Sequence, residues 1–153
     1  THGSLTDEQV QHVVGGFGEL TPQPDAAAAV RTAREAGIRV FTLTNGAAAT
    51  TLGFLERAGL AGDVEAVLSI DEVRAWKPVR AVYEHAVTAA GEPADRVALV
   101  AVHSWDIHGA RQAGLTTGWS PRLEGAPTRI FDRADVVADT LDAVVAGLAA
   151  LPD

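Results

Sequence analysis

The sequence contains no cysteine among its 153 residues. Disulfides, thiolate nucleophiles and zinc or iron–sulfur sites built from cysteine are therefore excluded. A chain without disulfides fits the reducing cytoplasm, which is the compartment we expect. Methionine is absent too, and the chain begins with THGSL. We therefore expect these residues to be a piece of a longer protein.

Basic residues and long apolar runs are also scarce. Lys and Arg number 12 against 20 Asp and Glu, for a net charge of −8. A chain this acidic is a poor partner for nucleic acid or anionic lipid. Its apolar runs fall short of the ~18 residues of a membrane span, and no secretory leader pattern is visible. With 47% hydrophobic and 21% charged residues, it is typical of one globular domain.

Short runs rich in β-branched residues alternate with helical patterns that end at glycine. The expected strands are 38–43, 66–70, 96–102, 115–119 and 134–138. The expected helices are 6–17, 25–36, 47–58, 76–90, 104–113 and 139–151, the last capped by Asp139. This alternation predicts an α/β fold, a parallel sheet with helices on both faces. The run 96–102 is apolar throughout, so we expect it to be buried on both faces.

Ligands of such sheets bind at the carboxyl ends of the strands. Thr44 and Asn45 follow one strand, Asp106 follows another, and Lys77 begins a helix. Each has a structural alternative. Thr44 and Asn45 could form a helix cap with a left-handed Asn-Gly turn, Lys77 could be a solvated surface residue, and Asp106 could complement a helix dipole.

Histidines offer little sign of a metal site. His103 and His108 flank Asp106, but their spacing matches no metal motif. His2, His12 and His85 have no convergent partners and are interpreted as surface residues. The Walker and Rossmann glycine patterns are absent.

Four segments in order resemble the haloacid dehalogenase superfamily, most closely the type II 2-haloacid dehalogenases. They are LTNGAAATTLGFLERAGL, VLSIDEVRAWKPVRAVYEHA, RVALVAVHSWDIHGARQAGL and TTGWSPR, and together they cover about residues 38–122. The resemblance implies a Rossmannoid core and a hydrolase that cleaves the carbon–halogen bond of a small 2-haloacid through an aspartyl ester.

The resemblance also implies roles for the strand-end residues. Thr44 would bind the substrate carboxylate, and Asn45 would hold the departing halide. Lys77 would pair with the nucleophilic carboxylate and offset the negative charge of the substrate.

Further roles fall on the residues that follow. Tyr83 and Trp105 would lie at the substrate pocket, and Asp106 would orient Lys77 and position the hydrolytic water. His103 stands where related dehalogenases often carry Asn, and it is placed among the substrate-binding residues.

The segment HSWD, residues 103–106, carries a single carboxylate where phosphatases of the superfamily usually pair acids around Mg²⁺. Because Mg²⁺ prefers several oxygen ligands, we expect no metal and no other cofactor. A phosphatase remains one alternative. A catalytically silent binding or assembly domain is the other, and a homodimer is left open.

No segment carries the nucleophile motif of the family, an Asp-x-x-Gly-Thr after an apolar strand. Residues 1–20 resemble the end of the helical cap, and 21–153 resemble a core that is incomplete at its N-terminus. We therefore expect the chain alone to be inactive. The missing strand would lie between 38–43 and 96–102, so these strands should be ~10 Å apart. Direct pairing of the two would instead indicate a rebuilt, non-catalytic domain.

Overall fold

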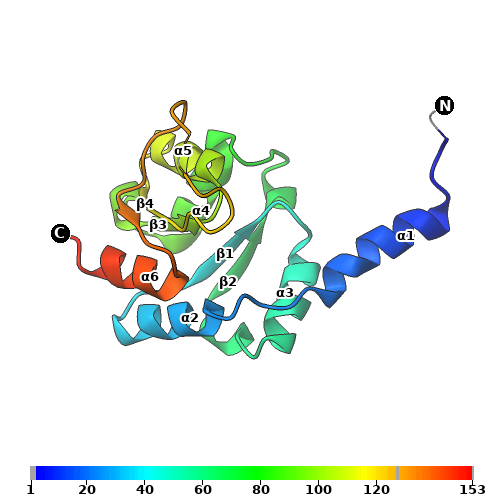
Figure 1. Cartoon of the computed structure of the whole chain (residues 1–153), viewed down its shortest axis with the longest axis horizontal. Helices are drawn as coiled ribbons and strands as arrows, with labels where there is room; N and C mark the ends of the chain where they lie inside the picture. The colour runs from blue at the N-terminus through cyan, green and yellow to red at the C-terminus, as the bar shows by residue number, and fades with distance from the viewer. Residues whose placement is uncertain (1–2, 127, 153) are drawn as a thin grey trace.

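The computed structural model describes residues 3–126 and 128–152 and has the expected α/β alternation (Figure 1). The helices are α1 Asp7–Gly16, α2 Ala26–Glu35, α3 Ala48–Arg57, α4 Arg80–Ala90, α5 Ser104–Gln112 and α6 Leu141–Ala149. The strands are β1 Phe41–Thr44, β2 Ala66–Ser69, β3 Ala98–Ala101, β4 Thr116–Trp119 and β5 Val136–Val137. Every expected element is present, with boundaries that differ by a few residues.

The strands form two parallel sheets. β1 pairs with β2, and β4 lies between β3 and β5. Within residues 3–126 and 128–152, β1 and β3 share no backbone ladder. Direct pairing, the outcome that would have indicated a rebuilt domain, is therefore not observed there, and the ~10 Å separation stays a prediction.

The expected double burial of 96–102 is wrong. Of β3, Ala98 is exposed and the other three residues are half-buried, and β1 is half-buried throughout. The physical reason is that each strand has a hydrogen-bonded neighbour on one side only in the described part of the chain. β1 also starts three residues late, because the Ile38 amide donates to Ala33 at 2.9 Å and closes α2 instead.

Two helix starts also differ from the prediction. α4 begins at Arg80, after a cis Lys77–Pro78 bond, rather than at 76–78. The N-cap of α6 is Thr140, not Asp139. The first free amide of α6, that of Leu141, donates to the Asp25 carboxylate at 2.7 Å, so its cap comes from the other end of the chain.

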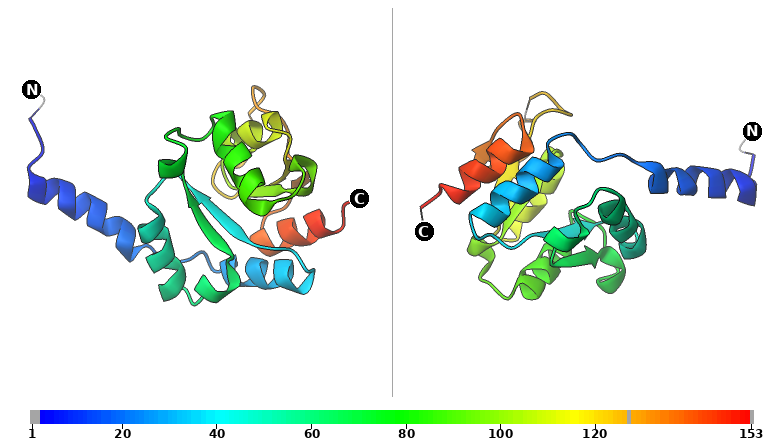
Figure 2. Two further views of the ribbon diagram at one scale, coloured as in Figure 1. Left: turned by 180° about the vertical axis from the view of Figure 1, so that it is seen from behind. Right: turned by 90° about the horizontal axis from the view of Figure 1, so that it is seen from below.

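Helices cover the sheets in layers. α2 and α6 lie side by side, as both views of Figure 2 show. α1 extends away from the rest of the molecule (Figure 1) and has no buried residue. Val13 and Val14 of this helix are exposed, as is Phe17 directly after it. None of the helices in the described ranges is long and apolar enough to cross a membrane.

The apolar core fixes α5 against α4. Tyr83 of α4 is packed with Ala110, Ala113 and Leu115. Tyr83 and Ala110 have no exposed surface. Because α5 starts directly after β3, this packing also fixes the side chains of its first turn at the carboxyl end of that strand.

Candidate active site

Lys77 and Asp106 form a buried ion pair. The distance from Nζ to Oδ2 is 2.8 Å, and the two side chains are only 12% and 6% exposed. Asp106, which the resemblance predicts to orient Lys77, is thus within ion-pair reach of it, and the alternative of a solvated surface lysine is wrong. Lys77 is also the only lysine of the chain, beside 11 arginines. A single lysine in a chain that otherwise uses arginine is a sequence signal for a specific role.

Tyr83 holds the other oxygen of Asp106. Its hydroxyl donates to Oδ1 at 2.6 Å, and the residue has no exposed surface. Burial, and then the hydrogen bond to the Asp106 carboxylate, raise the pKa of Tyr83 far above its usual value. It was expected among the substrate-binding residues. In the structure it contacts Asp106, as a protonated donor that positions the carboxylate, and its role in substrate binding stays a prediction.

The turn after β1 holds the backbone of Lys77. Asn45 Oδ1 accepts a hydrogen bond from the Lys77 amide at 3.0 Å, and Thr44 Oγ1 accepts one from Gly46 at 2.9 Å. The alternative of a left-handed Asn-Gly turn is wrong, because neither Asn45 nor Gly46 has a positive φ. Arg74 is the only non-glycine with positive φ among the described residues. Thr44, Asn45, Lys77 and Asp106 are therefore brought together at the strand ends.

His103 and Trp105 lie at the same end of β3. Their rings stack with centroids 5.4 Å apart and planes at 22°. His103 Nδ1 lies 3.4 Å from Glu124, whose other oxygen accepts the Ser104 amide at 3.0 Å. Burial opposes ionisation of Glu124, but the hydrogen bonds from Ser104 and His103 outweigh it and hold its pKa below the usual value.

Pattern reading missed Glu124 and Gly109. Glu124 lies in the irregular stretch 121–133, where no periodicity marks a partner. Gly109 lies inside α5, where glycine costs helix stability. A Cβ at Gly109 would lie 2.5 Å from the Tyr83 hydroxyl and 2.7 Å from Pro78. The glycine therefore permits the close approach that lets Tyr83 reach Asp106, and a glycine inside a helix was the available signal.

The residues weighed as metal ligands have separate partners. His103 faces Glu124, Asp106 faces Lys77, and His108 Nδ1 lies 3.0 Å from Asp132. Over the described ranges no three His, Asp or Glu side chains converge on one point. His85, expected on the surface, is half-buried, with Nε2 3.5 Å from the Glu72 carboxylate. His12 is exposed as expected, and His2 lies outside the described residues.

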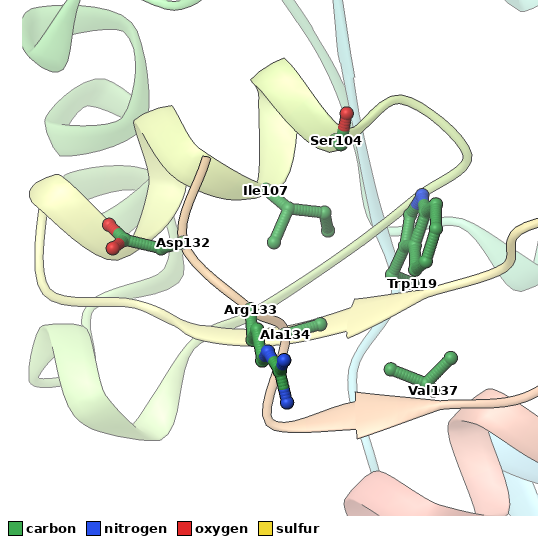
Figure 3. Close-up of a pocket in the computed structure, with 7 residues that line it drawn as sticks. All are labelled: Ser104, Ile107, Trp119, Asp132, Arg133, Ala134 and Val137. Carbon is green, nitrogen blue, oxygen red and sulfur yellow. The ribbon is translucent and has the colours of Figure 1, made fainter. Parts of the chain in front are cut away.

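A cavity of about 410 Å³ lies beside this site, between α5, β4 and β5 (Figure 3). Its wall includes the apolar side chains of Ile107, Trp119 and Val137. The charged residues Asp132 and Arg133 also line it. Lys77 and Asp106 are not among its lining residues. The ion pair is therefore not part of the cavity wall.

The model of the haloacid dehalogenase-like hydrolases matches residues 2–114. The chain belongs to this family. The match covers the ion pair, the turn after β1 and the stacked His103 and Trp105.

Individual relatives agree. Haloacetate dehalogenase H-2 of Moraxella sp. (strain B) is 30% identical over 126 residues, 82% of this chain and 56% of that protein. The (S)-2-haloacid dehalogenase of Pseudomonas putida is 29% identical over 132 residues, 86% of this chain and 56% of that protein. The chain thus spans about half the length of the curated relatives it matches.

A solved structure gives the same result. The L-2-haloacid dehalogenase RSc1362 superposes with a TM-score of 0.86 at 27% identity, over 96% of this chain and 65% of that one. The separate placement of β1 and β3 thus accompanies a fold close to that of a complete dehalogenase.

Proposed function

We propose that the protein containing this chain is a 2-haloacid dehalogenase, a hydrolase that replaces the halogen of a small 2-haloacid with a hydroxyl group. The observation that carries the proposal is the buried pair of Lys77 and Asp106 at the strand ends. Relatives named as haloacetate and (S)-2-haloacid dehalogenases support the substrate class.

The reaction would run in two steps. An Asp carboxylate, supplied from outside these 153 residues, displaces halide from the α-carbon and forms an aspartyl ester. Water then hydrolyses the ester and restores the carboxylate. Within this chain, Lys77 offsets the negative charge of the substrate, and Asp106 holds the ammonium and positions the water.

The turn after β1 would meet the substrate. We assign the substrate carboxylate to Thr44 and its backbone, and the departing halide to Asn45. Trp105 would line the pocket. The side-chain oxygen of Asn45 already accepts a hydrogen bond from the Lys77 backbone amide. The side-chain nitrogen of Asn45 is therefore the group that would face the halide.

A silent binding domain explains the ion pair less well. Removing two charges from water costs free energy that an apolar pair of similar volume does not. A domain that only binds or assembles has no need of that cost, whereas a site for an anionic substrate needs a fixed cation. The pair therefore favours the enzyme.

We further propose that residues 1–20 end a helical cap and that 21–153 form the core. α1 supports this division, since none of its residues is buried and it extends away from the sheets. A homodimer and a cytoplasmic location stay predictions.

Halide release tests the proposal. The product of the whole gene, which contains these 153 residues, is supplied with 2-chloropropionate or chloroacetate, and separately with an aryl phosphate. We expect halide and no phosphate. Phosphate release without halide would identify a phosphatase, and neither product would support the silent domain.

Lys77→Ala tests the site itself. We expect turnover to fall by about 100-fold or more, because the fixed charge at the site is lost, with an unchanged circular dichroism spectrum. The control is Arg80→Ala, which removes an exposed cation paired with Glu84 and should leave turnover unchanged. A Lys77→Ala enzyme at the wild-type rate would remove Lys77 from the mechanism.

Chelation tests the expected lack of a metal. Activity should survive excess EDTA, since HSWD supplies one carboxylate and Mg²⁺ prefers several oxygen ligands. Loss of activity that Mg²⁺ restores would favour the phosphatase.

A further inference from the structure

His103 is held on two sides. Its ring stacks on Trp105, and its Nδ1 faces Glu124 at 3.4 Å. Glu124 itself is fixed, because its second oxygen accepts the Ser104 amide at 3.0 Å. The Glu124 carboxylate therefore faces the Nδ1 edge of the imidazole.

That contact sets the position of the ring proton. An ionised carboxylate only accepts hydrogen bonds, so the nitrogen that faces it must carry the proton. In a neutral imidazole the other nitrogen, Nε2, is then an acceptor with a free lone pair. In the described part of the chain Nε2 has no hydrogen-bond partner, and 43% of the side chain is exposed.

The backbone of His103 lies one helical turn from Asp106. His103 is the N-cap of α5, and its carbonyl accepts the Asp106 amide at 3.1 Å, one turn from the ion pair. A base at this position is close to where the hydrolytic water is expected.

We propose that Glu124 is a positioning residue that keeps His103 in the Nδ1-protonated form, so that Nε2 takes the proton of the hydrolytic water. The inference rests on the proposed function, and it assigns to this chain the base of the second step. Glu124 acts only through His103 and touches neither the substrate nor the water.

The water oxygen bonds to the carbonyl carbon of the aspartyl ester while one water proton moves to Nε2 of His103. The bond between that carbon and the ester oxygen then breaks, and the departing alkoxide takes the proton from His103 to give the 2-hydroxyacid. The restored carboxyl group releases its own proton to solvent.

A purely structural role for Glu124 makes a different prediction. As a cap, Glu124 would matter only through the Ser104 amide. Glu124→Gln keeps an oxygen that can accept this amide but removes the charge that fixes the histidine proton. The variant thus separates capping from proton placement.

Nitrogen NMR of His103 reads the proton directly. At about pH 8, where an ordinary imidazole is neutral, the wild-type gene product should show protonated Nδ1 and unprotonated Nε2. Glu124→Gln should move the proton toward Nε2. The matched control is Asp132→Asn, which disrupts the similar pair of His108 and Asp132 and should leave the His103 signals unchanged. Protonated Nε2 in the wild type would overturn the proposal.

Rapid-quench kinetics test the catalytic consequence. His103→Gln should keep the first burst of halide, lower steady-state turnover by about 100-fold and accumulate the covalent ester, seen as an added mass on the protein. Glu124→Gln should give an intermediate loss at unchanged KM, and Asp132→Asn none. Wild-type turnover of His103→Gln, or loss of its burst, would overturn the assignment. A wild type that releases no halide would instead refute the proposed function.

Discussion

Lys77 Nζ lies 2.8 Å from Asp106 Oδ2, in a place where the two side chains are 12% and 6% exposed. The other carboxylate oxygen is taken by the Tyr83 hydroxyl at 2.6 Å. Both oxygens of the Asp106 carboxylate are therefore engaged, which fixes its orientation against the Lys77 ammonium. The attraction of this ammonium to Asp106 is little weakened by water.

Removing one charge of this pair should destabilise the protein strongly. Asp106→Asn leaves a buried ammonium without its counter-charge, and Lys77→Met leaves a buried carboxylate without its own. Each should lower the free energy of unfolding by about 3–5 kcal/mol. The double variant should lose less than the sum of the two, with a coupling of about 1–3 kcal/mol in urea unfolding. Additive losses would show that the two charges do not interact.

Tyr83 should stay protonated in the folded protein at a pH where ordinary tyrosines ionise. Its raised pKa means that the native state retains a proton that the unfolded state releases above about pH 10. Stability is therefore fully present below pH 10 and falls as the pH rises beyond it. The difference in absorbance at 295 nm between the wild type and Tyr83→Phe reports this one residue.

That difference should appear only together with unfolding, followed by circular dichroism. Phenolate absorbance near pH 10 in a protein that is still folded would contradict the assigned burial and the hydrogen bond to Asp106.

The convergence of Lys77 and Asp106 could be predicted from the sequence, although they are 29 positions apart. Ligand-binding residues of parallel sheets gather at the carboxyl ends of the strands, and this placement together with the family resemblance predicted the pair. The local turn at Asn45 could not be predicted. The side-chain oxygen Oδ1 of Asn45 accepts a hydrogen bond from the Lys77 amide, 32 positions away. Turn propensities depend only on residues that are close in the sequence.

The same limit explains the cap of α6 and the partner of His103. Asp139 had the expected chemistry and position for the cap, but Asp25 takes it across 116 positions. Glu124 comes from an irregular loop that carries no period. Contacts of this kind depend on how the loops pack, which helix and strand patterns do not encode.

Gly109→Ala should lower stability and loosen the hold on Asp106. The new Cβ would lie 2.5 Å from the Tyr83 hydroxyl, and overpacking of this kind costs about 1–3 kcal/mol, more than the ~1 kcal/mol gained in helix propensity. The matched control is Gly53→Ala in α3, where the nearest side-chain atom is the end of Arg57 at 3.5 Å. Gly53→Ala should be stabilised slightly. A stabilised Gly109→Ala variant would show that Tyr83 and Pro78 can move aside for the new methyl group.

The acid stability of the protein should depend on Asp25. The pKa of Asp25 is lowered to about 2, first by its hydrogen bonds with Arg122 and further by the amide of Leu141 at the start of α6. Because the folded pKa lies below the unfolded one, the stabilisation is present above about pH 4 and is lost as the pH falls toward 2. Asp25→Asn should therefore be less stable than the wild type at pH 6, and this gap in urea midpoint should shrink between pH 4 and 2. The control is Asp63→Asn, which breaks an exposed pair with Arg34 and should change the midpoint little at any pH. A gap for Asp25→Asn that stays constant down to pH 2 would mean that its charge does not hold α2, Arg122 and α6 together.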